Sequence, residues 1–472
     1  MGFHTFFFML GFKNFLLVSS ILALLSCSGS EESPAVKPEP VPPTPPPQAV
    51  LTEAELMDKV QRDVLRYFWE YAHPESKLAR ERYHVDNPGF DASVLSAGGS
   101  GFGMLNILVG IKNGYVPRSE AVARLTTALT FLQNADRFHG AWPHWINGST
   151  GKVLPFSAKD DGGDLVETAF IAQGLIAVRE YFKNSANAQE KELSEKADTL
   201  WRAIEWNFYT QGKEEGLYWH WSPNYGFEMN MKLQGFDETL VTYILAASSP
   251  EHSISKVNYE RGWARSGAVR SASSQYGIPV LAQHNGQGTG VGPLFWSHYS
   301  FLCLNPMGLQ DAYLDYGKVT TNHAQIQYQY ALANPKKWKD YGAKHWGLTA
   351  SYSRASDGGT TYNAHSPQND LGVISPTAAL SSMPFTPKES MQHLRMLYEE
   401  RASSLVGVAG PYDAYAPHYN WVANRYLAID QGTIGVMVEN HKSSFLWDLF
   451  MNAPEIKLGL KKLGFTSSRY TL

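Results

Sequence analysis

Two stretches of this chain consist of residues that would be apolar on every side of a helix. Ala169–Ala177 and Ile434–Val438 contain no charged side chain, and both are shorter than the roughly 20 residues that cross a membrane. A helix that is apolar all round must be covered by protein on all sides. Leu51–Tyr71, by contrast, places its apolar residues on one face. The sequence therefore predicts inner helices covered by outer ones.

Residues 51–472 read as further helices joined by long loops that are rich in aromatic residues and glycine. Hydrophobic periodicity predicts about ten helices. They span Leu51–Tyr71, Gly101–Asn113, Arg118–Phe138, Asp164–Phe182, Glu190–Tyr209, Asp237–Ala247, Thr321–Leu332, Asp370–Leu380, Pro387–Glu400 and Asp430–Leu449. Thr52, followed by Glu55, is typical of a capping box at the first helix start.

Few architectures accommodate this many helices in one domain without parallel strands. One is a superhelix of stacked helix pairs, and another is an (α/α) toroid with inner helices around an axis. No repeat of fixed period appears in the sequence. Long aromatic loops precede the apolar helices, and this pattern favours the toroid. We therefore expect an all-α fold in a single domain over residues 51–472.

The first 50 residues predict export and membrane attachment. Residues 1–26 carry one charged side chain before a short apolar run, as a signal peptide does. The run ends at Leu24-Leu25-Ser26-Cys27, which resembles a bacterial lipoprotein cleavage box, and ordinary secretion is the alternative. Residues 27–50 are rich in proline, which favours an extended tether. We expect a lipid anchor at Cys27 as the only membrane attachment, and an outer-membrane location facing the periplasm or the cell surface.

Charge and residue spacing argue against other classes of partner. The net charge of −4 argues against nucleic acid, which usually requires a basic patch. With Cys27 lipidated, Cys303 has no cysteine left to pair with. None of the 15 histidines forms the His-x-x-x-His spacing of a zinc-binding helix. The sequence predicts no metal and no other cofactor.

Acidic residues gather at the starts of three predicted helices. They are Asp160, Asp161, Asp164 and Glu167, then Asp237 and Glu238, and finally Asp430. A single acid at a helix start is typical of a cap, because it satisfies free N–H groups and suits the helix dipole. The first group holds more acids than a cap needs, and such like charges oppose one another unless they share protons or bind a polar ligand. Capping and function both stay open for each acid taken alone.

Hydrolysis of a glycosidic bond is one reaction that uses such acids. It needs one protonated carboxyl group and one ionised carboxyl group on either side of the bond. Glu238 is our candidate for the acid, because the neighbouring Asp237 would keep it protonated. Asp430 is our candidate for the base, and Glu439 is the reserve because Glu439-Asn440-His441 interrupts an apolar helix.

Aromatic residues suggest a sugar as the substrate. They make up 13% of the chain and concentrate in loops beside His, Asn and Asp. Aromatic faces pack on sugar rings, but they also close protein cores, and we expect about half of them to line a cleft. The candidate binding residues are Trp142, Trp145, Trp219, Trp296, His298, Tyr415 and Trp421, together with the acids Asp161, Asp164, Glu167 and Glu439.

Five motifs in order resemble the glycoamylase-like family of Bacteroidetes, whose members with assigned activity look like β-1,2-glucanases. The motifs are residues 161–168, 235–239, 296–301, 346–351 and 426–432. The resemblance implies an (α/α)6 toroid and hydrolysis of β-1,2-linked glucan with inversion. By motif, Glu238 resembles the general acid and Asp430 the base, while Asp164 and Glu167 resemble acidic subsite residues.

Three other functions remain alternatives. The older family label suggests a glucoamylase acting on α-glucan. A glycan-binding lipoprotein without catalysis would also be helical, tethered and rich in aromatic residues. A polysaccharide lyase on a similar toroid is disfavoured, because an acidic cleft would repel uronates.

Overall fold

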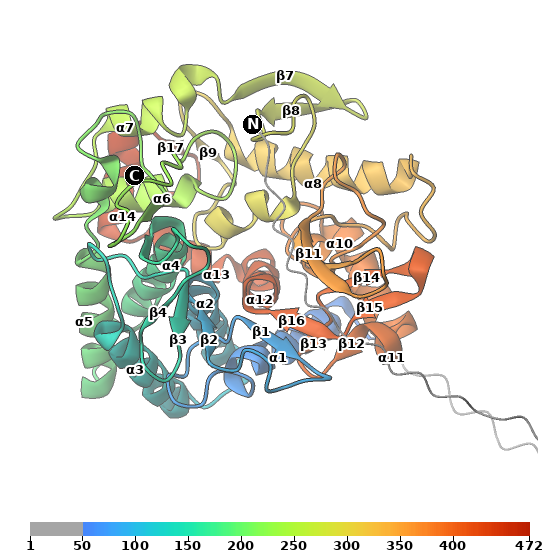
Figure 1. Cartoon of the computed structure of the whole chain (residues 1–472), viewed down its shortest axis with the longest axis horizontal. Coiled ribbons are helices and arrows are strands. Elements are labelled where there is room, and N and C mark those ends of the chain that lie inside the picture. Colours follow the sequence, from blue (N-terminus) through green and yellow to red (C-terminus); the bar gives the residue numbers. More distant parts are fainter. Residues whose placement is uncertain (1–50) are drawn as a thin grey trace, which may run out of the picture. The chain divides into compact units, whose positions relative to one another are not determined.

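The computed structural model describes residues 51–472, which form a helix-rich fold with small sheets between the helices (Figure 1). The predicted signal peptide, residues 1–26, and the predicted tether, residues 27–50, lie outside the described residues. The α-helices are α1 (Glu53–Trp69), α2 (Ala97–Lys112), α3 (Arg118–Asn134), α4 (Leu165–Phe182), α5 (Ala188–Arg202), α6 (Leu240–Ser248), α7 (Lys256–Arg261), α8 (Tyr316–Ala333), α9 (Pro376–Leu380), α10 (Pro387–Arg395), α11 (Ala402–Leu405), α12 (Ala428–Ser443), α13 (Phe445–Met451) and α14 (Pro454–Leu463). Shorter turns are η1 (Trp206–Thr210), η2 (Arg265–Gly267), η3 (Leu294–Ser297), η4 (Tyr299–Phe301), η5 (Met396–Glu400) and η6 (Pro417–Tyr419).

The helices fall into two sets that differ in how much of their surface is buried. Helix α4 is buried at every residue from 165 to 179, and α12 is buried from 430 to 440. Helix α1 buries only one face, which includes Leu56, Val60 and Val64. Helices α1, α3 and α5 pack behind α12, α2 and α4. The predicted division into inner and outer helices is confirmed.

Glycine allows the inner helices α2, α4 and α12 to approach one another closely. A Cβ atom at Gly101 of α2 would lie 2.2 Å from the carbonyl oxygen of Phe170 in α4. One at Gly435 of α12 would lie 2.1 Å from Oδ1 of Asn106 in α2. Glycine weakens a helix on its own, so tertiary packing supports α2 here. For this reason α2 begins at Ala97, whereas the sequence predicted a start at Gly101.

The strands are short and form sheets of two or three strands. They are β1 (Arg82–His84), β2 (Val94–Ser96), β3 (Trp145–Asn147), β4 (Val153–Leu154), β5 (Gly163–Asp164), β6 (His220–Trp221), β7 (Arg270–Gln275), β8 (Ile278–Ala282), β9 (Leu309–Gln310), β10 (Ala350–Arg354), β11 (Thr360–Ala364), β12 (Val406–Gly407), β13 (Gly410–Pro411), β14 (Ala414–Ala416), β15 (Trp421–Ala423), β16 (Arg425–Leu427) and β17 (Thr466–Ser467). β1 pairs with β16, and β5 pairs with β6, both antiparallel. These pairs bring loops that are distant in sequence to the starts of α4 and α12.

Two predicted helices are shorter in the structure than expected. The predicted helix Asp430–Leu449 is divided at Ser444, whose φ of 57° ends α12 before α13 begins. The predicted helix Asp370–Leu380 is helical only from Pro376, because Asp370 instead accepts hydrogen bonds from Tyr341 and Trp338. The capping box at α1 is confirmed, since Thr52 and Glu55 bond each other's backbone N–H groups.

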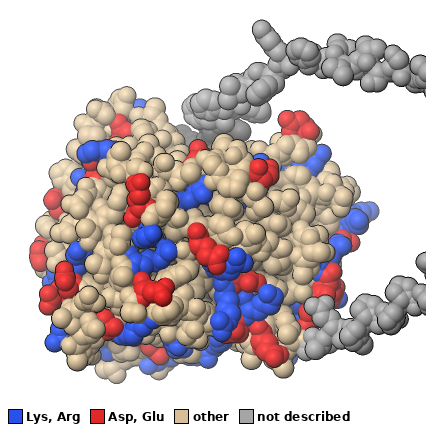
Figure 2. Space-filling model, turned by 90° about the horizontal axis from the view of Figure 1, so that it is seen from below, with Lys and Arg blue, Asp and Glu red and all other residues tan. Residues whose placement is uncertain are grey.

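Charges of both signs are interspersed on the face seen from below, with neutral surface between them (Figure 2). This distribution agrees with the net charge of −4. Among residues 51–472, no helix has the length and apolar character needed to span a membrane.

A buried carboxylate joins three helices at the far end of α12. Glu439 is fully buried and forms an ion pair with Lys112 at the end of α2. Its oxygens also accept hydrogen bonds from Asn113 at 2.8 Å, Gln61 of α1 at 3.0 Å and Ser443 at 2.6 Å. These donors lower the pKa of Glu439 to about 2 in spite of burial. Glu439 therefore stabilises the contact between α1, α2 and α12.

We predict that Glu439→Ala lowers the free energy of unfolding by ~3 kcal/mol, because it leaves the partly buried ammonium of Lys112 unpaired. Since folding lowers this pKa, the contribution is present above about 4.5, the ordinary value, and is lost as pH falls through about 2. Urea unfolding followed by tryptophan fluorescence measures the change. Glu120→Ala, an exposed glutamate on α3, is the control, and an equal effect from both variants would contradict the prediction.

Candidate active site

A cavity of about 380 Å³ opens where the starts of several buried helices meet. Ser96, the N-cap of α2, contributes to its wall, as do Val166 in the first turn of α4 and Ile429 in the first turn of α12. The other lining residues are Glu81, Arg82, His144, Trp145, Phe156, Glu167, Phe170, Trp219, Glu238, Phe295, Tyr299, Ala350, Tyr352, Tyr362 and Leu427. Residues from 81 to 429 thus converge on one space.

Glu238 lies two residues before the start of α6, and its side chain lines this cavity. Burial and the neighbouring charge of Asp237 raise the pKa of Glu238 well above its ordinary value. Asp237 itself is held outside the cavity lining. Its Oδ1 accepts from the backbone N of Thr239 at 2.9 Å, and its Oδ2 accepts from Asn285 at 2.7 Å. The two acids therefore differ in their surroundings: hydrogen bonds hold Asp237 just before α6, whereas burial and the charge of Asp237 favour the protonated form of Glu238.

Glu167 lines the cavity from the first turn of α4. Its Oε2 accepts a hydrogen bond of 2.6 Å from the backbone N of Gly98 in α2. Gly98 has no room for a side chain, because a Cβ atom would lie 2.6 Å from the same oxygen. Burial and the nearby Asp164 raise the pKa of Glu167 to about 7. Glu167 both joins α2 to α4 and places a titratable carboxyl group at the cavity wall.

Asp430 lies in the first turn of α12 and is 3% exposed. Burial and the adjacent Asp413 raise the pKa of Asp430 well above its ordinary value. Burial raises the pKa values of Tyr299 and Tyr362, whose side chains line the cavity, and Asp430 and Glu238 in their ionised forms raise them further. The structure thus brings the two predicted catalytic carboxyl groups to the same pair of tyrosines.

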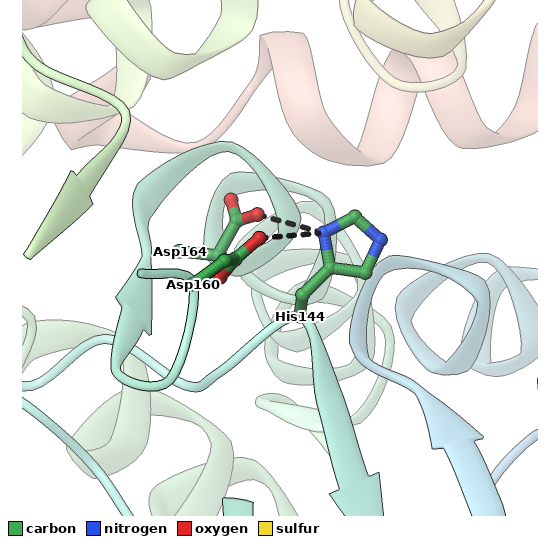
Figure 3. Close-up of side chains that lie close together, drawn as sticks. All are labelled: His144, Asp160 and Asp164. Atoms are coloured by element: carbon green, nitrogen blue, oxygen red, sulfur yellow. Dashed lines mark hydrogen bonds and ion pairs between the residues drawn. The ribbon is translucent and has the colours of Figure 1, made fainter. Parts of the chain in front are cut away.

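Two imidazoles and two carboxylates form a buried ion-pair cluster beside the cavity. Figure 3 shows three of these residues, His144, Asp160 and Asp164. Nδ1 of His144 lies 2.9 Å from Oδ2 of Asp164 and 3.9 Å from Oδ2 of Asp160. Nε2 of His220 lies 3.0 Å from Asp160 and 3.4 Å from Asp164. This cluster, formed by His144, Asp160, Asp164 and His220, is called the ion-pair cluster below.

The carboxylates of the ion-pair cluster keep both imidazoles protonated. Burial lowers both pKa values, but Glu167 together with Asp164 and Asp160 raises that of His144 to about 10, and Asp160 and Asp164 raise that of His220 to about 9. The two imidazoles in turn hold the pKa of Asp164 below its ordinary range against the effect of burial. Asp164 also caps α4, because its Oδ1 accepts from the backbone N of Glu167 at 2.9 Å. Asp164 therefore both caps α4 and belongs to the ion-pair cluster.

Three of these residues could also hold a cation. Donor atoms of His144, Asp160 and Asp164 lie within 4.8 Å of one another, and imidazole with carboxylate is a donor set that transition metals accept. Binding a cation would require the imidazoles to lose protons that their pKa values favour keeping. Two imidazolium groups already balance two carboxylates here. We therefore interpret His144 and His220 as protonated, and no step of the proposed reaction uses a metal.

Only part of the predicted aromatic set lines the cavity. Trp145 and Trp219 do so. Trp142 is fully buried in the core and donates its indole N–H to the carbonyl of Leu132 at 3.0 Å. Trp296 packs against the main hydrophobic core, and Trp421 packs against the small cluster around Tyr352. Both uses that the sequence left open for these rings thus occur.

Four other predicted binding residues also lie outside the cavity lining. The buried ring of His298 contacts the hydroxyl of Ser382 at 3.0 Å, and Tyr415 contacts His345 at 3.0 Å. Asp161 accepts a hydrogen bond from Asn224 at 2.6 Å. Glu439 belongs to the ion pair at the far end of α12. Their contacts are with other protein groups, as structural polar residues require.

Sequence reasoning missed several residues of this site. They are Glu81, Arg82, Tyr299, Tyr352, Tyr362 and Asp413, and the two cluster histidines had no assigned role. A signal for the histidines was present, because each directly follows a Trp-Pro or Tyr-Trp pair in an aromatic loop (residues 142–145 and 218–221). Arg80-Glu81-Arg82 reads as solvated charge, and only the pairing of β1 with β16 brings Glu81 to the cavity.

One family model and several known proteins resemble this chain. Residues 230–454 match the Glycoamylase family model, described as "Putative glucoamylase". An endo-β-1,2-glucanase from Chitinophaga pinensis, solved as a sophorotriose and glucose complex, is 50% identical with a TM-score of 0.86. The match covers 89% of this chain and 100% of that one.

Two further relatives extend the comparison. The exo-β-1,2-glucooligosaccharide sophorohydrolase of Parabacteroides distasonis is 39% identical over 435 residues, which cover 88% of this chain. The match spans 58% of that relative's length. An endo-β-1,2-glucanase from Talaromyces funiculosus, solved with sophorose, is 12% identical with a TM-score of 0.61, and the match covers 87% of this chain and 88% of that one. At this identity the likeness concerns the fold alone.

We predict that the ion-pair cluster loses stabilising energy as pH rises. Because folding raises the pKa values of His220 and His144 above 6.5, their contribution is full below 6.5 and is lost as pH passes about 9 to 10. The thermal midpoint of the wild type should fall between pH 7 and pH 10 more steeply than that of His220→Gln. Differential scanning fluorimetry across pH measures both slopes.

His418→Gln, which changes an exposed histidine, should keep the wild-type slope. If Zn²⁺ instead raised the thermal midpoint of the wild type and left His220→Gln unchanged, the cluster would hold a cation rather than two protons.

Proposed function

Because the chain belongs to the glycoamylase-like family that includes the Chitinophaga pinensis endo-β-1,2-glucanase, we propose that it is a glycoside hydrolase that cleaves β-1,2-linked glucan. The observation that carries this proposal is the pair Glu238 and Asp430. Both carboxyl groups are withdrawn from water, and both contribute to the raised pKa values of Tyr299 and Tyr362, which line one cavity.

Glu238 serves as the general acid in this proposal. Its raised pKa keeps it protonated at neutral pH, so it donates a proton to the glycosidic oxygen as the bond breaks. Asp430 lies beside the cavity-lining residue Ile429 and contributes to the raised pKa values of Tyr299 and Tyr362, and in this proposal it serves the water that attacks the anomeric carbon. Attack by water in a single displacement inverts the anomeric configuration, which proton NMR of fresh product detects.

The cavity walls fit a chain of sugar rings. Trp145 and Trp219 offer aromatic faces, and the buried indole N–H of Trp145 has no hydrogen-bond partner among the described residues. Phe156 is 50% exposed at the cavity and stacks on His144 with ring centroids 4.1 Å apart. The exposed ring of Phe156 over His144, beside the free indole N–H of Trp145, suits a neutral polyhydroxylated ligand.

A physical argument counts against one rival substrate, and a sequence comparison counts against another. An anionic uronate, the substrate of a lyase, would lie beside the carboxyl groups of Glu81 and Glu167. The family description "Putative glucoamylase" suggests an α-glucan, whereas the relative with 50% identity is an endo-β-1,2-glucanase. We therefore favour the β-1,2 linkage.

The finer fold that we propose is an (α/α)6 toroid. Its inner ring is α2, α4, α6, the turns η3 and η4, α9 and α12, and its outer helices are α1, α3, α5, α7, α8 and α10. Support comes from the order of contacts, in which α2 meets α4, α4 meets α6, α6 meets η4, α9 meets α12, and α12 returns to α2. The contact of His298 with Ser382 links the turns to the end of α9.

We predict that Glu238→Gln lowers kcat on linear β-1,2-glucan by about 1,000-fold with little change in KM, because an amide cannot donate the proton. Product formation is followed by chromatography of the released oligosaccharides. Soluble starch, incubated in parallel, tests the α-glucan alternative.

Asp237→Asn is the matched control. It should retain activity, while the alkaline limb of the kcat profile moves to lower pH, because the charge of Asp237 raises the pKa of Glu238. If wild-type protein bound β-1,2-glucan without cleaving it, and Glu238→Gln behaved identically, the chain would be a binding protein.

We also propose that Cys27 is lipidated and anchors the protein to the outer membrane. The support is the sequence Leu24-Leu25-Ser26-Cys27 after a signal-like apolar run. Acyl chains contribute about 0.8 kcal/mol per buried CH₂ group, so more than one chain gives stable attachment.

Cys27→Ser, expressed with its own leader in a bacterial host, should move from the membrane fraction to the soluble fraction. The wild type should incorporate labelled palmitate, and Cys303→Ser should do so equally. Equal release of wild type and Cys27→Ser would refute the anchor.

A further inference from the structure

A second buried carboxyl group lies against Asp430. Asp413 stands just before β14 and is 5% exposed. Its Oδ2 accepts a hydrogen bond of 2.7 Å from the backbone N of Tyr352, whereas its Oδ1 is buried without a donor. Asp430 is 3% exposed, its oxygens are buried among the described residues, and the hydroxyl of Tyr299 lies close enough to lower its pKa. The two carboxyl groups are within hydrogen-bond reach of each other.

Two ionised carboxylates in contact and away from water would be strongly unfavourable, so the pair keeps a proton. Burial raises the pKa of Asp413 to about 6, and burial together with Asp413 raises the pKa of Asp430 further. Asp430 therefore holds the proton and donates it to Asp413. The pair titrates as a unit and carries a single negative charge at neutral pH.

Other groups that face the pair come from five elements. Glu81 precedes β1, Tyr299 lies in η4, and Tyr352 and Tyr362 lie in the hairpin of β10 and β11. Burial raises the pKa of Tyr352, and Arg82 in β1 and Arg425 in β16 oppose that rise. Glu81 adds negative charge, which further disfavours a doubly ionised pair.

A protonated Asp430 cannot by itself take a proton from water. We propose that Asp413 is the positioning residue that solves this problem: Asp430 passes its proton to Asp413 as it receives one from the attacking water. This inference rests on the proposed hydrolysis and assigns a role to a residue that neither the motifs nor the relatives single out.

The proton and bond changes balance. The oxygen of water forms a bond to the anomeric carbon, and the glycosidic C–O bond breaks. One proton of water goes to Asp430, the proton of Asp430 goes to Asp413, and the proton of Glu238 goes to the leaving oxygen. The pair changes from −1 to neutral and Glu238 from neutral to −1. Exchange with solvent restores both groups.

Asp413→Asn tests the relay. The amide oxygen still accepts from the backbone N of Tyr352, but the side chain cannot take a proton. We expect a fall in kcat of about 100-fold, with KM and the thermal midpoint close to wild type. In the wild type, kcat should decline as pH falls through about 6, the pKa of Asp413. In the variant this limb should shift away from its wild-type position, because Asp430 then titrates without Asp413, whose charge and hydrogen bond contribute to its raised pKa.

Asp370→Asn is the matched control. Asp370 is 2% exposed and accepts hydrogen bonds from Tyr341 and Trp338, so its loss should lower the thermal midpoint without moving the acid limb. The double variant Asp413→Asn/Asp430→Asn should be no slower than Asp430→Asn alone, because the two residues act as a unit. Wild-type kcat with an unmoved acid limb in Asp413→Asn, or strictly additive losses, would overturn the relay.

Carbon-13 NMR of aspartate-labelled protein tests the pair without substrate. Two carboxyl resonances should shift together near pH 6 in the wild type, and Asp413→Asn should leave one resonance that titrates as a single group at a different pH. Independent titration of the two groups refutes the pair whatever the enzyme assay shows. If the wild type cleaves no β-1,2-glucan, the proposed function fails and the relay fails with it, while coupled titration would then establish the proton-sharing pair alone.

Discussion

The withdrawal of carboxyl groups from water is the constraint on which the chemistry of this protein depends. An isolated carboxyl group in a low-dielectric place favours its neutral form, and a carboxyl group beside a cation favours its charged form. Glu238, Glu167, Asp413 and Asp430 show the first effect, and Asp164 shows the second. Acids of similar intrinsic strength are thereby divided into proton donors, proton-sharing groups and fixed charges.

The fold creates that withdrawal by arranging helices that cannot face water. Because α2, α4 and α12 are buried along most of their length, their N-terminal ends meet inside the protein. Glycine at positions 98 and 101 brings α2 against α4, so that Glu167 bonds the backbone of the neighbouring helix. Short antiparallel pairs such as β1 with β16 then close loops over this junction. The cavity is a consequence of close packing at one end of the buried helices.

The ion-pair cluster gives this acidic site a compensating positive charge. His144 and His220 balance Asp160 and Asp164, and His144 also reaches the cavity, where Phe156 covers its ring. Without these imidazolium groups, Glu167 and Glu238 would face two more unpaired carboxylates. The titration of Glu238 and Glu167 is therefore coupled to residues that need not touch the substrate.

Local residue pattern determined a good deal of this protein. Apolar runs such as Ala169–Ala177 predicted buried helices, Thr52 with Glu55 predicted a helix start, and acids before apolar helices predicted Glu238, Glu167 and Asp430 as neighbours of a site. Such features depend on residues a few positions apart. Only the tertiary structure decided that Trp142 fills the core while Trp145 lines the cavity, that Glu439 pairs with Lys112, and that Asp413 meets Asp430. Those outcomes depend on contacts between distant segments, and the burial and charge that set a pKa exist only after those segments have packed together.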